Sequence, residues 1–125
     1  MEGDTMRIAV TAQGQQLSAP VDPRFGRAKF FVVVDTETGE SSAADNTQNL
    51  NAAQGAGIQA GRNVVELGVK AVITGHVGPK AFTTLQAGGV AVYTGATGTV
   101  ADAIEQFKAG KLKQSTGADV EGHWV

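Results

Sequence analysis

The order of structural elements is clearest in residues 70–94, KAVITGHVGPKAFTTLQAGGVAVYT. Two short apolar runs, residues 70–74 and 90–94, have the length and composition that are typical of strands. Between them, a tight loop at residues 75–78 is followed by Pro79, which suits the first position of a helix because its missing N–H has no intrahelical partner there. A pair of glycines then precedes the second apolar run. The stretch therefore predicts a β-α-β unit.

The rest of the chain extends this unit in both directions. Alternating or continuous apolar residues predict further strands before it, and apolar residues spaced by three and four predict a helix on each side of it. Because right-handed crossovers make the strands of such units parallel, we expect a mixed five-stranded sheet with helices on both faces and the order β-β-β-α-β-α-β-α. The further strands are expected at residues 7–11, 29–35 and 40–44, and the further helices over residues 53–67 and 100–107.

A chain of 125 residues is about one domain. We expect a short flexible leader at residues 1–5, a single α/β domain at residues 6–113 and a mobile tail at residues 114–125. No apolar run approaches the roughly 20 residues that span a bilayer, and the N-terminus lacks the pattern of a secretory signal. We therefore expect a cytoplasmic protein with no membrane association.

The composition excludes several classes of function. The chain has 17 Gly, two His and no Cys, so disulfides, zinc ribbons, thiolate-held iron–sulfur clusters and cysteine nucleophiles are excluded. The net charge of −2 argues against a broad nucleic-acid-binding face. The nucleophile motif G-x-S-x-G is missing, and the predicted strands supply few carboxylates, so we expect no enzyme.

Three loops are expected to meet beyond the carboxyl-terminal ends of the parallel strands, where ligands collect in open α/β sheets. They are residues 13–28, 75–80 and 94–99, and the last two lead into helix N-termini, whose free N–H groups and positive dipole suit anions. The start of the longest helix adds a fourth segment. Each glycine taken alone could be only a turn or a cap, and the arginines could be ordinary solvated residues. The candidate binding residues are Arg24, Gly26, Arg27, Gly55, Gly57, Gly75, His76, Gly78, Lys80, Gly95 and Thr97.

Four short motifs, taken in order, resemble the dinitrogenase iron–molybdenum cofactor family. They are Met6–Val10, Pro23–Ala28, Gly55–Ile58 and Gly75–Ala81. The resemblance covers roughly residues 6–113. It implies a ribonuclease-H-like three-layer α/β fold and the binding or carrying of a molybdenum-containing metal–sulfide cluster.

The chain is most similar to stand-alone, cysteine-free members of the family, which implies a mixed molybdenum–copper sulfide cluster. Many members have His where this chain has Arg24; arginine is not a normal metal ligand, but it can hydrogen-bond anionic sulfides. His76 is then the candidate for direct metal contact. We expect a non-enzymatic carrier or scaffold that holds the cluster by charge and backbone N–H groups. The alternatives are a phosphate- or nucleotide-binding regulatory module and a protein-interaction adaptor.

Overall fold

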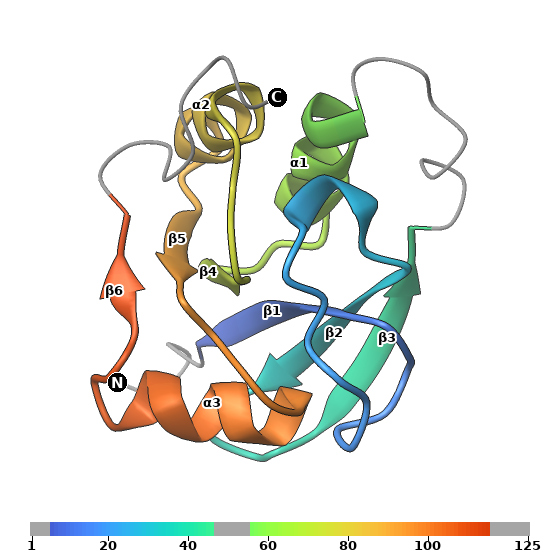
Figure 1. Cartoon of the computed structure of the whole chain (residues 1–125), viewed down its shortest axis with the longest axis vertical. Helices are drawn as coiled ribbons and strands as arrows, with labels where there is room; N and C mark the ends of the chain where they lie inside the picture. Colours follow the sequence, from blue (N-terminus) through green and yellow to red (C-terminus); the bar gives the residue numbers. More distant parts are fainter. Residues whose placement is uncertain (1–5, 47–55, 116–125) are drawn as a thin grey trace.

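The fold is described from a computed structural model, which covers residues 6–46 and 56–115. A single six-stranded sheet has the strand order β3-β2-β1-β4-β5-β6, and three α-helices cover it (Figure 1). The strands are β1 (Arg7–Ala12), β2 (Phe30–Asp35), β3 (Ser41–Asp45), β4 (Ala71–Ile73), β5 (Ala91–Thr94) and β6 (Lys113–Gln114). The helices are α1 (Ala56–Glu66), α2 (Pro79–Ala87), α3 (Val100–Lys108) and a short 3₁₀ helix, η1 (Phe25–Arg27).

The middle of the sheet combines antiparallel and parallel pairs. β1 pairs antiparallel with β2, and β2 with β3, while β1, β4 and β5 run parallel. The parallel strands arise from the two crossovers that the sequence predicts, and they end at one edge of the sheet. The predicted mixed α/β architecture is therefore confirmed.

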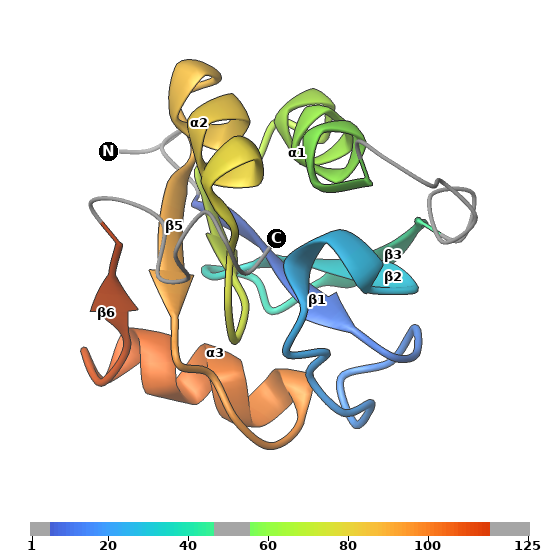
Figure 2. The ribbon, with the colours of Figure 1, turned by 45° about the horizontal axis from the view of Figure 1, so that its top comes forward.

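Each face of the sheet has its own hydrophobic core, because side chains alternate between the two faces of a strand. Helices α1 and α2 and the 3₁₀ helix η1 cover one face, and α3 covers the other (Figure 2). Ala9 and Val72 face the first group, whereas Ile8, Val10 and Ile73 face α3. Helices on both faces were expected, and the structure confirms them.

Local signals in the sequence set the helix ends. Pro79 is the first residue of α2, and Gly68, with a φ of +75°, follows the end of α1. At the start of α3, Thr99 and Asp102 form a reciprocal capping box in which each side chain accepts a hydrogen bond from the other residue's backbone N–H.

The sheet has one strand more than the sequence predicts. After α3 the chain returns along β5, where Tyr93 pairs with Gln114 and the N–H of Ser115 donates to the carbonyl of Val92 at 2.8 Å. The predicted mobile tail, residues 114–125, is therefore wrong at its first residue, which lies in β6. A two-residue strand is too short to leave a periodic pattern in the sequence. Residues 116–125 lie outside the described part of the chain.

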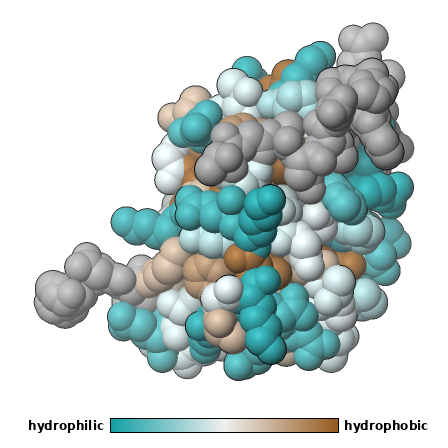
Figure 3. Space-filling model, turned by 60° about the vertical axis from the view of Figure 1, so that its left-hand side comes forward, coloured by the Kyte–Doolittle hydropathy of each residue, from teal (hydrophilic) through white to brown (hydrophobic). Residues whose placement is uncertain are grey.

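The side of the molecule that carries β6 and α3 shows a narrow apolar band between hydrophilic residues (Figure 3). Partly buried side chains from β5, α3 and the segment before β6 pack here against the core below α3. Tyr93 and Phe107 form an edge-to-face pair with ring centroids 4.9 Å apart. In the described part of the chain, no helix is long and apolar enough to cross a membrane.

The capping box gives a test of the fold. Replacing Thr99 by Ala leaves the N–H of Asp102 without its acceptor, so the free energy of unfolding should fall by about 1 kcal/mol in a urea titration. Thr83→Ala is the control, because the Thr83 hydroxyl donates only to the Pro79 carbonyl on the exposed surface of α2. An equal loss in both variants would contradict a specific role for the cap.

Candidate functional site

Three loops meet at the carboxyl-terminal edge of the parallel strands, as the sequence predicts. The N–H of His76 donates to the carbonyl of Pro23 at 2.8 Å, and the N–H of Phe25 donates back to the carbonyl of His76 at 3.3 Å. On the other side of the same loop, the N–H of Gly95 donates to the carbonyl of Gly75 at 3.2 Å. Segments far apart in the sequence are thus joined by backbone hydrogen bonds at this edge.

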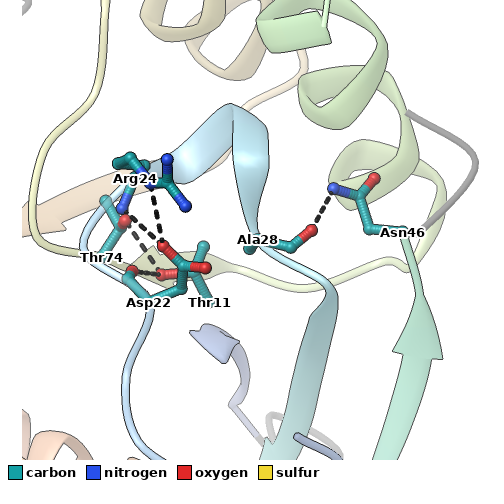
Figure 4. Close-up of polar contacts among 6 residues, drawn as sticks. All are labelled: Thr11, Asp22, Arg24, Ala28, Asn46 and Thr74. Atoms are coloured by element: carbon teal, nitrogen blue, oxygen red, sulfur yellow. Dashed lines mark hydrogen bonds and ion pairs between the residues drawn. The ribbon is translucent and has the colours of Figure 1, made fainter. Parts of the chain in front are cut away.

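A buried polar cluster lies below this junction (Figure 4). The hydroxyl of Thr11, at the end of β1, donates to the carbonyl of Asp22 at 2.7 Å and lies 2.9 Å from the hydroxyl of Thr74, just after β4. The N–H of Asp22 donates in return to the carbonyl of Thr11 at 2.9 Å. Both threonines are fully buried. The cluster therefore fixes the long loop against the ends of two strands.

The carboxylate of Asp22 positions Arg24. Its Oδ1 accepts a hydrogen bond from the N–H of Arg24 at 3.0 Å and lies 3.7 Å from Arg24 Nε (Figure 4). The Asp22 side chain is only 4% exposed, whereas the Arg24 side chain is 69% exposed. The sequence analysis missed Asp22. The dipeptide Asp22-Pro23 is a signal that could have revealed it, because an aspartate before proline often accepts the backbone N–H two residues on.

Asn46 joins the 3₁₀ helix to α1, and the sequence analysis missed it as well. Its Nδ2 donates to the carbonyl of Ala28 at 2.7 Å (Figure 4), and its Oδ1 accepts a hydrogen bond from Asn63 of α1 at 3.3 Å. Asn46 is buried, although it lies in a polar stretch of the sequence directly after β3. One clue was available: an Asn directly after a strand can satisfy backbone groups that have no ladder partner.

The first turns of α1 and α2 lie side by side beside η1. A Cβ built on Gly57 would contact Ala81 Cβ at 3.4 Å, and η1 packs against α1. Gly78, the residue before α2, provides no side-chain cap, and Pro79 has no N–H. The N–H groups of Lys80 and Ala81 have no hydrogen-bond partner among the described residues. The positive end of α2 therefore keeps two N–H groups that no described residue accepts, that of exposed Lys80 and that of Ala81, which is only 3% exposed.

Three exposed cations lie on the segments that meet at this edge. Arg24 and Arg27 come from the loop and η1, and Lys80 lies in the first turn of α2; all three are exposed. His76 is exposed too, and its backbone pairs with that of Arg24 in an isolated parallel bridge. The four residues thus lie on segments that meet at this edge, and the backbones of Arg24 and His76 are paired directly.

The expectation of free N–H donors is wrong at the start of α3. Carbonyl groups of the long loop and side chains of α3 occupy them, because residues 17–19 pack against the first turn of this helix. The backbone N–H groups of Val100 and Ala101 donate to the carbonyls of Ala19 and Leu17, respectively. Those of Asp102, Thr99 and Thr97 donate to side-chain oxygens of Thr99, Asp102 and Gln106, respectively. Sequence patterns mark a helix end but do not show which carbonyls reach it.

The predicted glycines have different roles. Gly75 is buried between the loops, where a Cβ would lie 2.8 Å from the Cα and carbonyl oxygen of Pro23. Gly95 adopts a φ of +88°, which favours glycine. Gly26 is half-buried within η1. Gly55 lies outside the described residues.

The side chains of this edge are not arranged to hold a bare metal ion. Over residues 6–46 and 56–115, no group of three or more His, Cys, Asp and Glu side chains lies close enough to do so. The arrangement suits an anion, which can use the open N–H groups and the three cations.

A model of the family described as "Dinitrogenase iron-molybdenum cofactor" matches residues 6–110. The chain belongs to the dinitrogenase iron-molybdenum cofactor family. The resemblance seen in the sequence motifs is thereby confirmed, and the match covers all the described loops of the site.

Solved structures of similar proteins share this fold. The apo form of the orange protein from Desulfovibrio gigas is 42% identical, with a TM-score of 0.89 over 93% of this chain and 98% of that one. A Thermotoga protein provisionally assigned to NifB is 39% identical, with a TM-score of 0.80 over 94% and 99% of the two chains. Among proteins compared by sequence, an uncharacterized protein of Methanocaldococcus jannaschii is 32% identical over 87% of this chain and 91% of its own length.

The contact between Gly75 and Pro23 gives a second test. In Gly75→Ala the added methyl group would collide with the Pro23 backbone, so the loops must separate and the free energy of unfolding should fall by about 1–3 kcal/mol. Gly57→Ala is the control, because its methyl group would make only an ordinary contact with Ala81. A Gly75→Ala protein as stable as the control would show that the loops do not pack this closely.

Proposed function

We propose that this protein is a non-enzymatic carrier or scaffold for a molybdenum–copper sulfide cluster. The cluster is a cargo held non-covalently at the open end of α2. The observation that carries the proposal is this helix end, at an edge whose segments bear the exposed cations Arg24, Arg27 and Lys80, in a chain of the dinitrogenase iron-molybdenum cofactor family. The similarity to the orange protein supports the same class of role.

The residues of the site fit such a cargo. The chain has no cysteine, so a metal–sulfide cluster has to bring its own sulfides. A preassembled cluster of this kind is a polyanion, and its sulfides can accept hydrogen bonds from the N–H groups of Lys80 and Ala81 and from guanidinium groups. His76 offers an imidazole nitrogen at the same edge, and it is the proposed direct metal contact.

The proposal extends to the finer features of the protein. We place the fold among the ribonuclease-H-like three-layer folds, with residues 6–113 as the cofactor domain. The cytoplasm is the proposed location. Gly55, Gly95 and Thr97 are also proposed as cofactor-binding residues, in addition to the residues around α2.

Reconstitution tests the proposal. The protein is incubated without oxygen with tetrathiomolybdate and a copper salt, then desalted. We expect a visible chromophore to elute with the protein together with molybdenum and copper. Elution of all the colour with small molecules would contradict a carrier of this cluster.

The charges of the site give a third prediction. Arg24→Ala, Arg27→Ala, Lys80→Ala and His76→Ala should each lower the amount of retained chromophore, because each removes a positive charge or a metal contact near the open N–H groups. The melting temperature should change little, since these side chains are exposed. Retention by the three charge variants should fall further as the salt concentration rises.

Lys108→Ala is the matched control, because Lys108 is an exposed cation on α3, across the sheet from the site. The control should retain as much chromophore as the unchanged protein. Equal loss of retention in Lys108→Ala would indicate that net charge alone holds the cluster. Equal unfolding of all the site variants would indicate structural roles instead.

The same helix end also suits a phosphate group. The alternative function is therefore a phosphate- or nucleotide-binding regulatory module. Calorimetry with a nucleotide panel distinguishes the two functions. Tight nucleotide binding by a protein that takes up no metal would favour the alternative, and the absence of heat with every nucleotide would favour the cluster.

A further inference from the structure

The buried carboxylate of Asp22 is an unusual neighbour for an anion-binding site. Its side chain is 4% exposed and lies below the Arg24 loop, at the end of β1 (Figure 4). A carboxylate repels an anionic cargo and also attracts the cation that the cargo needs. The function of this residue therefore needs an explanation beyond the proposed binding of the cargo.

Asp22 makes two separable interactions with Arg24. One is a hydrogen bond in which Asp22 Oδ1 accepts the Arg24 backbone N–H at 3.0 Å, and this bond fixes the turn. The other is an ion pair in which the same oxygen lies 3.7 Å from Arg24 Nε. The first needs only an oxygen acceptor, whereas the second needs the negative charge.

The two partners differ in their freedom to move. The backbone of Asp22 is fixed by its paired hydrogen bonds with Thr11 on β1. The Arg24 side chain is 69% exposed, so its guanidinium can turn away from the carboxylate toward the surface at little cost. Arg24 also lies beside His76, at the edge where the cargo is proposed to bind.

We propose that Asp22 competes with the anionic cargo for the Arg24 guanidinium and so promotes release of the cargo. This inference rests on the proposed function. Asp22 is a positioning residue, because it acts through Arg24. Its oxygen places the Arg24 backbone beside His76, and its charge provides an alternative partner for the guanidinium when the cargo leaves. A carrier needs both to bind and to release its cargo. The Asp22–Arg24 ion pair promotes release without a conformational change of the fold.

Two substitutions at Asp22 should have opposite effects. Asp22→Asn keeps an oxygen that can accept the Arg24 N–H and removes the competing charge, so the chromophore should leave the protein about two- to fivefold more slowly. Asp22→Ala removes the acceptor as well, so the turn loosens and the chromophore should leave faster than from the unchanged protein. Release is measured as transfer of copper from the loaded protein to an excess of a copper(I) chelator.

The double variant Asp22→Asn with Arg24→Gln tests whether Asp22 acts through Arg24. In the Arg24→Gln background the slowing caused by Asp22→Asn should disappear. If slowing persists there, or if Asp22→Asn releases the cargo as fast as Asp22→Ala, the inference is wrong. A protein that never retains the chromophore would instead contradict the proposed function.

A second measurement needs no cargo. In the unloaded protein, the nitrogen resonance of Arg24 Nε should shift in Asp22→Asn, because its partner is lost. The Nε resonance of Arg62, an exposed arginine on α1, is the control and should not move. An unchanged Arg24 resonance would show that the ion pair is not formed in solution and would overturn the inference.

Discussion

The site depends on the hydrogen bonds that fasten the long loop between β1 and β2 to the ends of the parallel strands. Thr11 and Asp22 exchange two hydrogen bonds, and Pro23 and His76 are joined by another. Thr11 and Asp22 are buried, and a buried polar group that lost its partner would destabilise the fold by about 1–3 kcal/mol. Separating the loop from the sheet is therefore energetically unfavourable, and Arg24 stays beside His76 in the loop before α2.

Much of the fold could be predicted because its signals are local. Pro79 at the start of α2, the Thr99–Asp102 box at the start of α3 and the apolar alternation of β1 each act over a few residues. β6 could not be predicted, since its two residues are specified by pairing with β5 and not by their own pattern.

The candidate site was predictable in part for the same reason. The topology requires that the loops after β1, β4 and β5 meet at one edge, and hydrogen bonds between Gly75, His76 and their neighbours confirm that they do. The availability of backbone N–H groups was not predictable, because it depends on which carbonyls the long loop presents. The carbonyls of Leu17 and Ala19 accept hydrogen bonds from N–H groups at the start of α3, whereas no described residue accepts one from the N–H groups of Lys80 and Ala81.

Asp22 and Asn46 were missed because their importance comes from burial, which a polar residue in a loop does not suggest.

We propose that an anionic cargo binds at the start of α2 and not at the start of α3. Titration of ¹⁵N-labelled protein with preformed copper–thiomolybdate, without oxygen, tests it most directly. We expect the amide resonances of Lys80 and Ala81 to shift or broaden first, together with that of Arg24, while those of Val100 and Ala101 stay unchanged. Changes confined to the first turn of α3, or spread evenly over the surface, would contradict it.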